Sequence, residues 1–262
     1  MNSAIATEAV SPKAAGSGSR FFRAARKVLK VSWLWAASIV FACMVLNWLW
    51  VSSGSGQWVL ELDRDGTQVY SMKVPGDSVV KFRGVTEYDY SYSQMLSAFI
   101  DAESFTEDCG KLAAGCLEYR FIVPFDPVHL TNTQYWRTEL FPPFSNREVV
   151  LKGTIVQDPR TKEILLENTA APSLLPPNDC CVRITRLHNT WRYTPQHNGK
   201  VQVEYVQNFS GGGFLPDFVL SLGAEAVHQL LHKDIPKLLD NDTYRHARLE
   251  FIQEYRDTDP AA

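Results

Sequence analysis

The sequence lacks the short motifs by which many enzymes are found. It has no Gly-x-Ser-x-Gly nucleophile elbow, and Gln229 after His228 breaks the His-Glu-x-x-His pattern of zinc hydrolases. It lacks a Cys-x-x-Cys pair, so its five cysteines do not predict a zinc site. The glycines at residues 211–213 are not followed by the Lys-Ser/Thr pair that a phosphate-binding loop needs. We therefore predict no catalytic residue, no metal ion and no cofactor.

An excess of charge of either sign is missing as well. The formal net charge is −3, and the dense basic cluster lies within residues 20–30, before the folded part. Nucleic-acid binding would require a basic stripe on the folded part, so we predict no nucleic-acid partner. With 262 residues, of which 45% are hydrophobic, the chain can instead bury the core of one sizeable domain.

The run from Val31 to Val51 contains no charged residue. At about 20 residues it is long enough to cross a bilayer as a helix, and tryptophans lie near both ends, as in interfacial belts. A cleaved signal peptide is the alternative, although its apolar part normally has about 7–15 residues. A lipoprotein cysteine at Cys43 fits less well, because Phe41 stands two positions before it.

The basic residues before this run predict its orientation. Positively charged flanks stay in the cytoplasm, so the N-terminus is expected there whether the run is an anchor or a signal sequence. The globular part is then exported to the periplasmic or extracellular side. In an oxidising compartment, a disulfide between Cys109 and Cys116 is the first expectation. The adjacent Cys180 and Cys181 have three open possibilities: a vicinal bridge, two thiols, or pairing elsewhere.

Residue patterns predict many strands before one long helix. Alternating apolar residues predict strands at residues 58–62, 68–74, 78–88, 117–125, 130–141, 148–157, 163–168, 182–194 and 200–209. Ser91 is expected to cap a short helix that ends near Ile100. Apolar residues at helical spacing predict a long amphipathic helix over residues 215–239. The absence of regular strand–helix alternation indicates an α+β fold with an antiparallel sheet.

His228 and His232 on that helix are spaced as two metal-binding histidines can be. They flank the apolar stripe, so we expect histidines that face solvent or lie at its rim.

Several segments, in the same order, resemble the START domain family, the lipid-transfer module named after the steroidogenic acute regulatory protein. They include Cys-Val-Arg at residues 181–183, Trp-Arg-Tyr-Thr-Pro at 191–195, Glu-Tyr-Val at 204–206 and Gly-Gly-Phe-Leu-Pro-Asp-Phe-Val at 212–219. Pro-Pro-Phe-Ser-Asn-Arg-Glu-Val-Val at 142–150 is similar to the family's Pro-x-x-Ser-x-Arg-Asp segment, with Glu148 in place of Asp. The apolar run suggests a bacterial, membrane-anchored or exported member.

The resemblance implies a helix-grip fold, in which a curved antiparallel sheet grips a long C-terminal helix around a lipid-sized cavity. We then expect a disordered basic N-terminus at residues 1–30, an anchor or signal sequence at 31–52, a START-like ligand-binding domain at 57–240 and a C-terminal extension at 241–262. The partner would be a hydrophobic small molecule, a lipid or a sterol-like compound.

Two groups of residues are candidates for the ligand site. Phe218, Val219 and Leu222 lie on the apolar stripe of the long helix, where helix and sheet are expected to diverge. Arg137, Glu139 and Arg183 are charged residues within strand-like stretches, and they are the candidates for polar groups that would orient a ligand. A buried charge must be paired, so an Arg–Glu pair facing the cavity is one hypothesis, and a solvent-facing row is the other.

Three functions fit this outline. The first is a ligand carrier without chemistry. The second is a helix-grip enzyme of the cyclase or aromatase type, which would need two polar groups at reactive distance inside the cavity. The third is an interaction module with a collapsed cavity, which would show a packed interior.

Overall fold

The computed structural model describes residues 18–101, 109–111, 115–213 and 223–255. The chain divides into two compact units, Met1–Trp50 and Val51–Ala262, which are described separately. The predicted apolar run belongs to one helix, α1 (Gly18–Ser52). Its segment Lys30–Ser52 is long and apolar enough to cross a membrane, and large side chains such as Trp33 and Phe41 are exposed along it.

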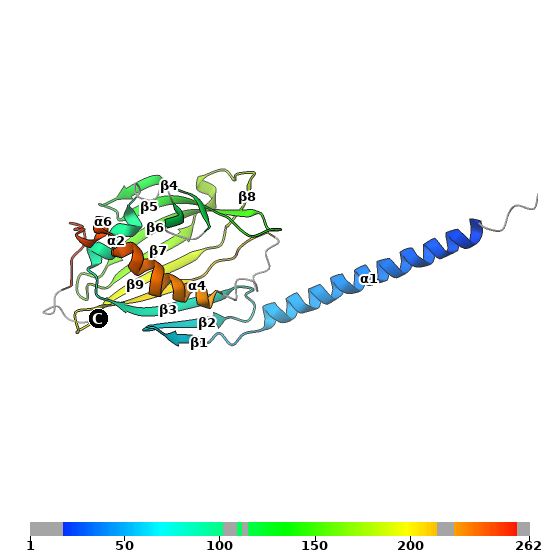
Figure 1. Ribbon diagram of the computed structural model, residues 1–262, viewed down its shortest axis with the longest axis horizontal. Helices are drawn as coiled ribbons and strands as arrows, with labels where there is room; N and C mark the ends of the chain where they lie inside the picture. Colours follow the sequence, from blue (N-terminus) through cyan, green and yellow to red (C-terminus); the bar gives the residue numbers. More distant parts are fainter. Residues whose placement is uncertain (1–17, 102–108, 112–114, 214–222, 256–262) are drawn as a thin grey trace, which may run out of the picture. The chain divides into compact units, whose positions relative to one another are not determined.

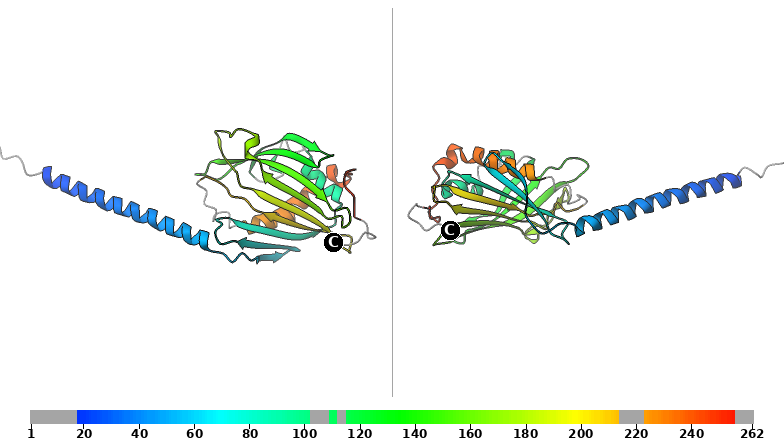
Figure 2. Two further views of the ribbon diagram at one scale, coloured as in Figure 1. Left: turned by 180° about the vertical axis from the view of Figure 1, so that it is seen from behind. Right: turned by 90° about the horizontal axis from the view of Figure 1, so that it is seen from below.

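The described residues of the second unit form a ten-stranded sheet, and Figures 1 and 2 show how its strands are arranged. The strands are β1 (Val59–Arg64), β2 (Thr67–Lys73), β3 (Val80–Tyr88), β4 (Cys116–Asp126), β5 (Thr131–Thr138), β6 (Asn146–Gln157), β7 (Ile164–Ala170), β8 (Cys181–Arg183), β9 (His188–Pro195) and β10 (Val201–Gln207). Their order is β1-β2-β3-β10-β9-β7-β6-β5-β4, with antiparallel neighbours, while β8 pairs with β6 in parallel. The predicted α+β class with a curved antiparallel sheet is confirmed.

The strand expected over residues 182–194 is not continuous, so that prediction was wrong. Residues 181–183 form β8 beside β6, and the chain then crosses to form β9 between β7 and β10. Ile184, in the crossing, is buried against Val149 and Leu151. Because Ile184 is apolar and buried, the apolar pattern continues through the connection, although the hydrogen bonds between strands are interrupted there. The pattern alone therefore could not reveal the break.

Helices cover one face of the sheet (Figure 1). They are α2 (Tyr92–Ile100), which Ser91 caps as predicted, then α4 (Ala224–Gln229), the π-helical turn η4 (Leu230–Asp234), α5 (Ile235–Leu239) and α6 (Asp242–Arg245). Short 3₁₀ turns are η1 (Cys109–Lys111) and η2 (Pro172–Leu174). The first part of the predicted long helix, residues 215–222, lies outside the described residues.

The described part of the C-terminal helix rests directly on the sheet. Val227, Leu231, Ile235 and Leu239, spaced four residues apart, are its buried stripe. A Cβ atom on Gly84 of β3 would lie only 2.4 Å from Leu231 Cδ1, so glycine is what allows this close approach. The stripe therefore fixes this part of the helix against β3.

The π-helical turn has a local cause. Pro236 has no N–H, and the Ile235 N–H bonds to the Leu230 carbonyl, so the Leu231 carbonyl loses its helical donor. The hydroxyl of Tyr88 on β3 donates to that carbonyl instead. Burial raises the pKa of Tyr88, so the hydroxyl keeps its proton at neutral pH. Tyr88 thus links the irregular turn to the sheet.

Replacing Tyr88 by Phe is expected to leave the buried Leu231 carbonyl without a donor. The free energy of unfolding should fall by about 1–3 kcal/mol. The control is Tyr90→Phe, because the Tyr90 hydroxyl bonds to Asp240 in an exposed position and its loss should cost less. Chemical denaturation measures both. Equal losses in the two variants would show that Tyr88 does not support the turn.

Residues beyond 240, expected to be an extension, contribute to the packed domain. Tyr244 and Ile252 are buried in the main core. The Glu254 carboxylate accepts hydrogen bonds from the backbone N–H groups of Tyr92 and Ser93, at the N-terminus of α2. Near the first residues of this unit, Lys73 Nζ donates a hydrogen bond to the Ser53 carbonyl at 3.0 Å, so the segment before β1 is bonded to β2.

Candidate functional site

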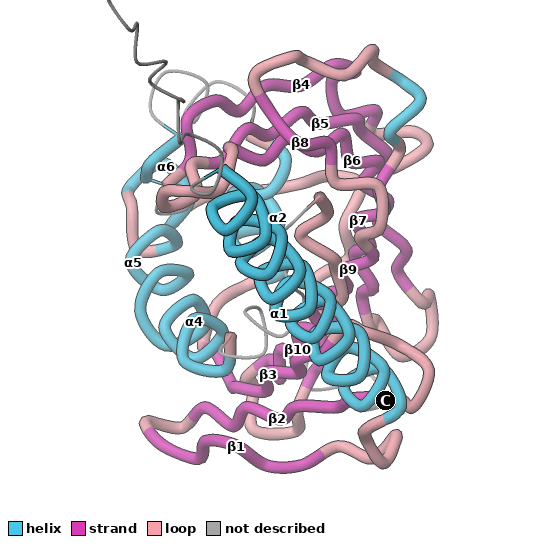
Figure 3. Tube along the Cα trace, turned by 90° about the vertical axis from the view of Figure 1, so that its right-hand side faces the viewer, coloured by secondary structure: helices cyan, strands magenta, loops and turns pink. Residues whose placement is uncertain are grey.

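A cavity of about 460 Å³ lies between the inner face of the sheet and the helices. This volume falls within the range of small-molecule pockets, about 300–1,000 Å³. In Figure 3 the strands curve from β1 round to β4 and face α2, α4 and α5. Most of the lining is apolar: Phe99, Tyr119, Trp136, Val149, Leu151, Ile155, Leu166, Ile184, Leu187, Trp191, Phe209, Leu230, Ile235 and Leu238.

Strand parity decides which side chains reach the cavity. In β6 the alternate residues 147, 149, 151, 153 and 155 line it, with Thr154 as an exception to the alternation, and in β5 residues 132, 134, 136 and 138 do so. Successive strand residues point to opposite faces. Arg147 therefore faces the cavity, whereas Glu148 and Arg137 point to the other side of the sheet.

The described lining includes five side-chain amides, which we call the amide belt: Asn132, Gln134, Asn168, Asn189 and Gln207. Asn132 pairs across strands with Gly153, Gly153 with Asn168, and Asn168 with Asn189.

A Cβ atom on Gly153 would lie 2.4 Å from Asn132 Oδ1, so glycine makes room for the belt. Within it, Gln134 Nε2 donates to Asn132 Oδ1 at 3.2 Å, and Trp136 Nε1 donates to Gln134 Oε1 at 3.0 Å. The belt presents neutral hydrogen-bonding groups within an apolar lining.

Among the residues that the structure describes, Arg147 is the buried cation of the cavity lining, with 5% of its surface exposed. Its Nε donates to the Gly211 carbonyl at 2.6 Å, Nη2 donates to the Gly212 carbonyl at 3.1 Å, and Nη1 donates to the Ser145 carbonyl. Burial lowers the pKa of this guanidinium. The glycine turn after β10 is thus held by a charged side chain that also faces the cavity.

The outer face of β6 carries a buried ion pair. Arg183 Nε lies 2.9 Å from Glu148 Oε1, and these side chains are 7% and 0% exposed. Glu148 also accepts from the Tyr135 hydroxyl and the Asn178 N–H, both at 2.9 Å. Arg183 donates further to the carbonyls of Pro172, Leu175 and Pro176. This network fixes the connection between β7 and β8.

Burial works against the charge of Glu148 and raises its pKa. The hydrogen bonds from Arg183, Asn178 and Tyr135 outweigh this effect, so the pKa lies below its usual value. The carboxylate is therefore charged at neutral pH.

The predicted polar residues lie apart from the described cavity lining. Arg137 Nη2 is 3.3 Å from Glu118 Oε2, and Glu139 is exposed. Arg183 belongs to the pair with Glu148, so an Arg–Glu pair is present, on the outer face of β6. Phe218, Val219 and Leu222 lie outside the described residues.

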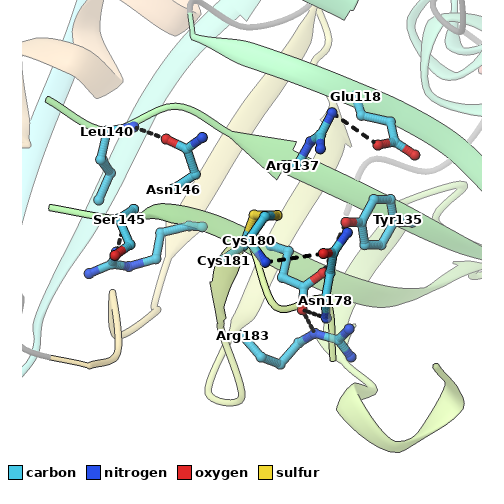
Figure 4. Close-up of a disulfide and its surroundings, with 12 residues drawn as sticks. Glu118, Tyr135, Arg137, Leu140, Ser145, Asn146, Asn178, Cys180, Cys181 and Arg183 are labelled. Atoms are coloured by element: carbon cyan, nitrogen blue, oxygen red, sulfur yellow. Dashed lines mark hydrogen bonds and ion pairs between the residues drawn. A yellow bond between two sulfur atoms is a disulfide. The ribbon is translucent and has the colours of Figure 1, made fainter. Parts of the chain in front are cut away.

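The cysteines and histidines are placed as follows. Cys109 and Cys116 form a disulfide with a Cα–Cα distance of 5.6 Å. Cys180 and Cys181 form a vicinal disulfide (Figure 4).

His228 is buried, with only 3% of its surface exposed, so the prediction that it lies at the surface or rim was wrong. Its Nε2 lies 3.3 Å from the carbonyl oxygen of Arg64, at the end of β1.

Sequence reasoning missed Arg147 and the amide belt as cavity residues. Arg147 could have been found from its position in β6, because it is an even number of residues away from Leu151 and Ile155 and so lies on the same face of the strand. Apolar residues on both faces at positions 149–151 concealed which face was inward.

Comparison with solved structures shows which fold this is. The STAR-related lipid transfer protein fragment from Xanthomonas axonopodis matches with a TM-score of 0.61 and 24% identity, over 70% of this chain and 99% of that one. Human STARD10 matches with a TM-score of 0.59 and 17% identity, over 72% and 75%. Human StAR-related lipid transfer protein 5 matches with a TM-score of 0.53 and 14% identity, over 78% and 96%.

The architecture is therefore a helix-grip fold. More specifically, it is the fold of START-related lipid transfer domains, and the resemblance seen in the sequence is confirmed for the fold. No family model matches the chain. Among curated proteins, an uncharacterized protein of Pseudomonas aeruginosa is 24% identical over 162 residues, which are 62% of this chain and 76% of that protein.

Proposed function

We propose that this protein binds one hydrophobic molecule, a lipid or sterol-like compound, inside the cavity and carries it to or from a membrane. The observation that supports this most is the cavity itself. It has about 460 Å³ of space, an apolar wall and a small set of fixed polar groups. That combination is typical of small-molecule sites, in which the apolar wall supplies affinity and the polar groups set orientation.

The expected affinity follows from buried area. Burying about 500 Å² of apolar ligand surface at roughly 25 cal/mol per Å² contributes on the order of 12 kcal/mol before the costs of ordering and opening. A ligand held in this way rarely leaves into water. Transfer at a bilayer surface avoids that step, because the ligand passes from one apolar environment to another.

The C-terminal helix is the proposed cover of the cavity. It contributes Leu230, Ile235 and Leu238 to the lining. We propose that this helix or the neighbouring loops shift to admit the ligand.

Membrane anchoring completes the proposal. The segment Lys30–Ser52 would cross the bilayer with the N-terminus in the cytoplasm, and the domain would lie on the periplasmic or extracellular side. The two disulfides fit an oxidising compartment.

Native mass spectrometry of the full chain tests the proposed function. The chain is purified from membranes in a mild detergent and released from the micelle in the gas phase. We expect one bound small molecule per chain, and organic extraction of the same sample should recover it. Detergent-only adducts, together with extracts no richer than those of an unrelated single-helix membrane protein, would contradict the proposal.

A further inference from the structure

Arg147 and Glu148 are consecutive residues of β6 whose charges do not neutralise each other. Parity directs Arg147 into the cavity and Glu148 to the outer face. There Glu148 is already engaged by Arg183 and Tyr135. The described cavity lining holds one carboxylate, that of Asp234, which is exposed and forms no ion pair with Arg147.

The hydrogen bonds of Arg147 leave both charge and donors available. Its three bonds go to backbone carbonyls, which are dipoles without net charge. A guanidinium has five N–H donors, so one N–H on each terminal nitrogen remains. A buried charge without a counter-ion is costly, and a carboxylate or phosphate that forms two parallel hydrogen bonds with it would relieve that cost.

The surroundings of Arg147 extend this argument along the cavity. The next inward residues of β6 are Val149 and Leu151, followed by Gly153 beneath the amide belt and then Ile155. At about 3.3 Å per residue the row from Arg147 to Ile155 spans at most about 26 Å. One end of the row is cationic, and the part next to it is apolar.

We propose that the ligand is an amphiphile with an oxyanion at one end, and that Arg147 binds this oxyanion inside the cavity. The chain of the ligand lies along Val149 and Leu151 toward the amide belt. This inference rests on the proposed function, because it names the class of molecule that the same cavity holds. A carboxylate and a phosphate share the required chemistry.

Three photoreactive probes with the same hexadecyl chain separate the possibilities: the fatty acid, the alcohol and the alkyl phosphate, each with a diazirine. The full chain is placed in nanodiscs of zwitterionic phosphatidylcholine at mildly alkaline pH, and labelling of peptides from β6 is measured. The alcohol has the same chain but no negative charge, so its labelling measures binding in the cavity without an oxyanion. The ratio of the acid or phosphate yield to the alcohol yield is compared between variants, because the partitioning of each probe into the bilayer is the same for every variant and cancels in that comparison.

For the wild-type chain we expect an oxyanion probe to label β6 at least about tenfold more than the alcohol, in line with charge-assisted hydrogen bonds. Arg147→Gln should lower this ratio by about tenfold or more, while alcohol labelling persists. Arg147→Lys should retain part of the preference, because the charge remains. Arg137→Gln is the matched control, since its partner Glu118 lies outside the cavity lining, and it should keep the full ratio.

The outcomes distinguish the two proposals. If the wild-type chain labels equally with acid, phosphate and alcohol, or if the ratio survives in Arg147→Gln, this inference fails while ligand binding stands. If no probe labels β6, the proposed function fails too. If Arg147→Gln does not fold, the wild-type ratios and Arg147→Lys decide. The stronger of the acid and phosphate probes identifies the head group.

Discussion

Replacing Leu151 by Trp is expected to lower ligand retention by about tenfold or more while the domain stays folded. Leu151 lies in the inward row of β6, and an indole there would occupy space that we assign to the ligand. In a close-packed core the same change would instead overpack the interior and cost about 1–3 kcal/mol of stability. The test therefore pairs retention of a fluorescent sterol or fatty-acid probe with the thermal midpoint of the same sample.

Lys152→Trp is the matched control for this test. Lys152 is the next residue of the same strand and is exposed on the opposite face, so its replacement adds the same side chain outside the cavity. Retention should be unchanged in this variant. Unchanged retention with a lowered midpoint in Leu151→Trp would show that the space is packed core, and the main structural reason for a carrier would be lost.

The fold could be predicted because most of its elements leave periodic patterns. Strands β2, β3, β6 and β10 and helix α2 fall within a few residues of the ranges expected from apolar alternation and capping. Strand β8 was not predicted as a separate strand, because three residues are too few to show an alternation of apolar and polar side chains. The π-helical turn in the C-terminal helix could not be predicted from the sequence. It depends on Pro236 together with Tyr88, and Tyr88 is 143 positions away from Leu231, whose carbonyl it binds.

The candidate site was harder to predict, because its polar residues lie on the face that a sequence would assign to solvent. In β5 the inward residues include Asn132 and Gln134, so the polar face of that strand is the cavity face. In β6 Val150 is fully buried on the outer face, and apolar character therefore does not distinguish the two faces. The two hypotheses for the charged residues were a pair that faces the cavity and a row that faces solvent, and neither of them concerned Arg147. The Arg183–Glu148 pair is buried on the outer face of β6, and Arg147 is the arginine in the described part of the cavity lining.

Glu148→Gln is expected to destabilise the domain by about 3–5 kcal/mol. The substitution keeps the size of the side chain and removes its charge, so Arg183 is left buried without a carboxylate. The control is Glu118→Gln, which breaks the pair with Arg137. Those side chains are 35% and 31% exposed, and the loss should be below about 1 kcal/mol. Chemical denaturation of the full chain in mild detergent, followed by near-ultraviolet circular dichroism, measures both.

The dependence of this difference on pH tests its cause. The pKa of Glu148 in the folded domain lies below its usual value, because the hydrogen bonds from Arg183, Asn178 and Tyr135 outweigh the opposing effect of burial. A depressed folded pKa contributes stability that is fully present above the unfolded value, about 4.3, and is lost as the pH falls through the folded value. The difference between the wild type and Glu148→Gln should therefore be constant near neutral pH and shrink below about pH 4. A difference that stays constant down to the acid transition would mean that Glu148 acts through its shape and neutral hydrogen bonds rather than through its charge.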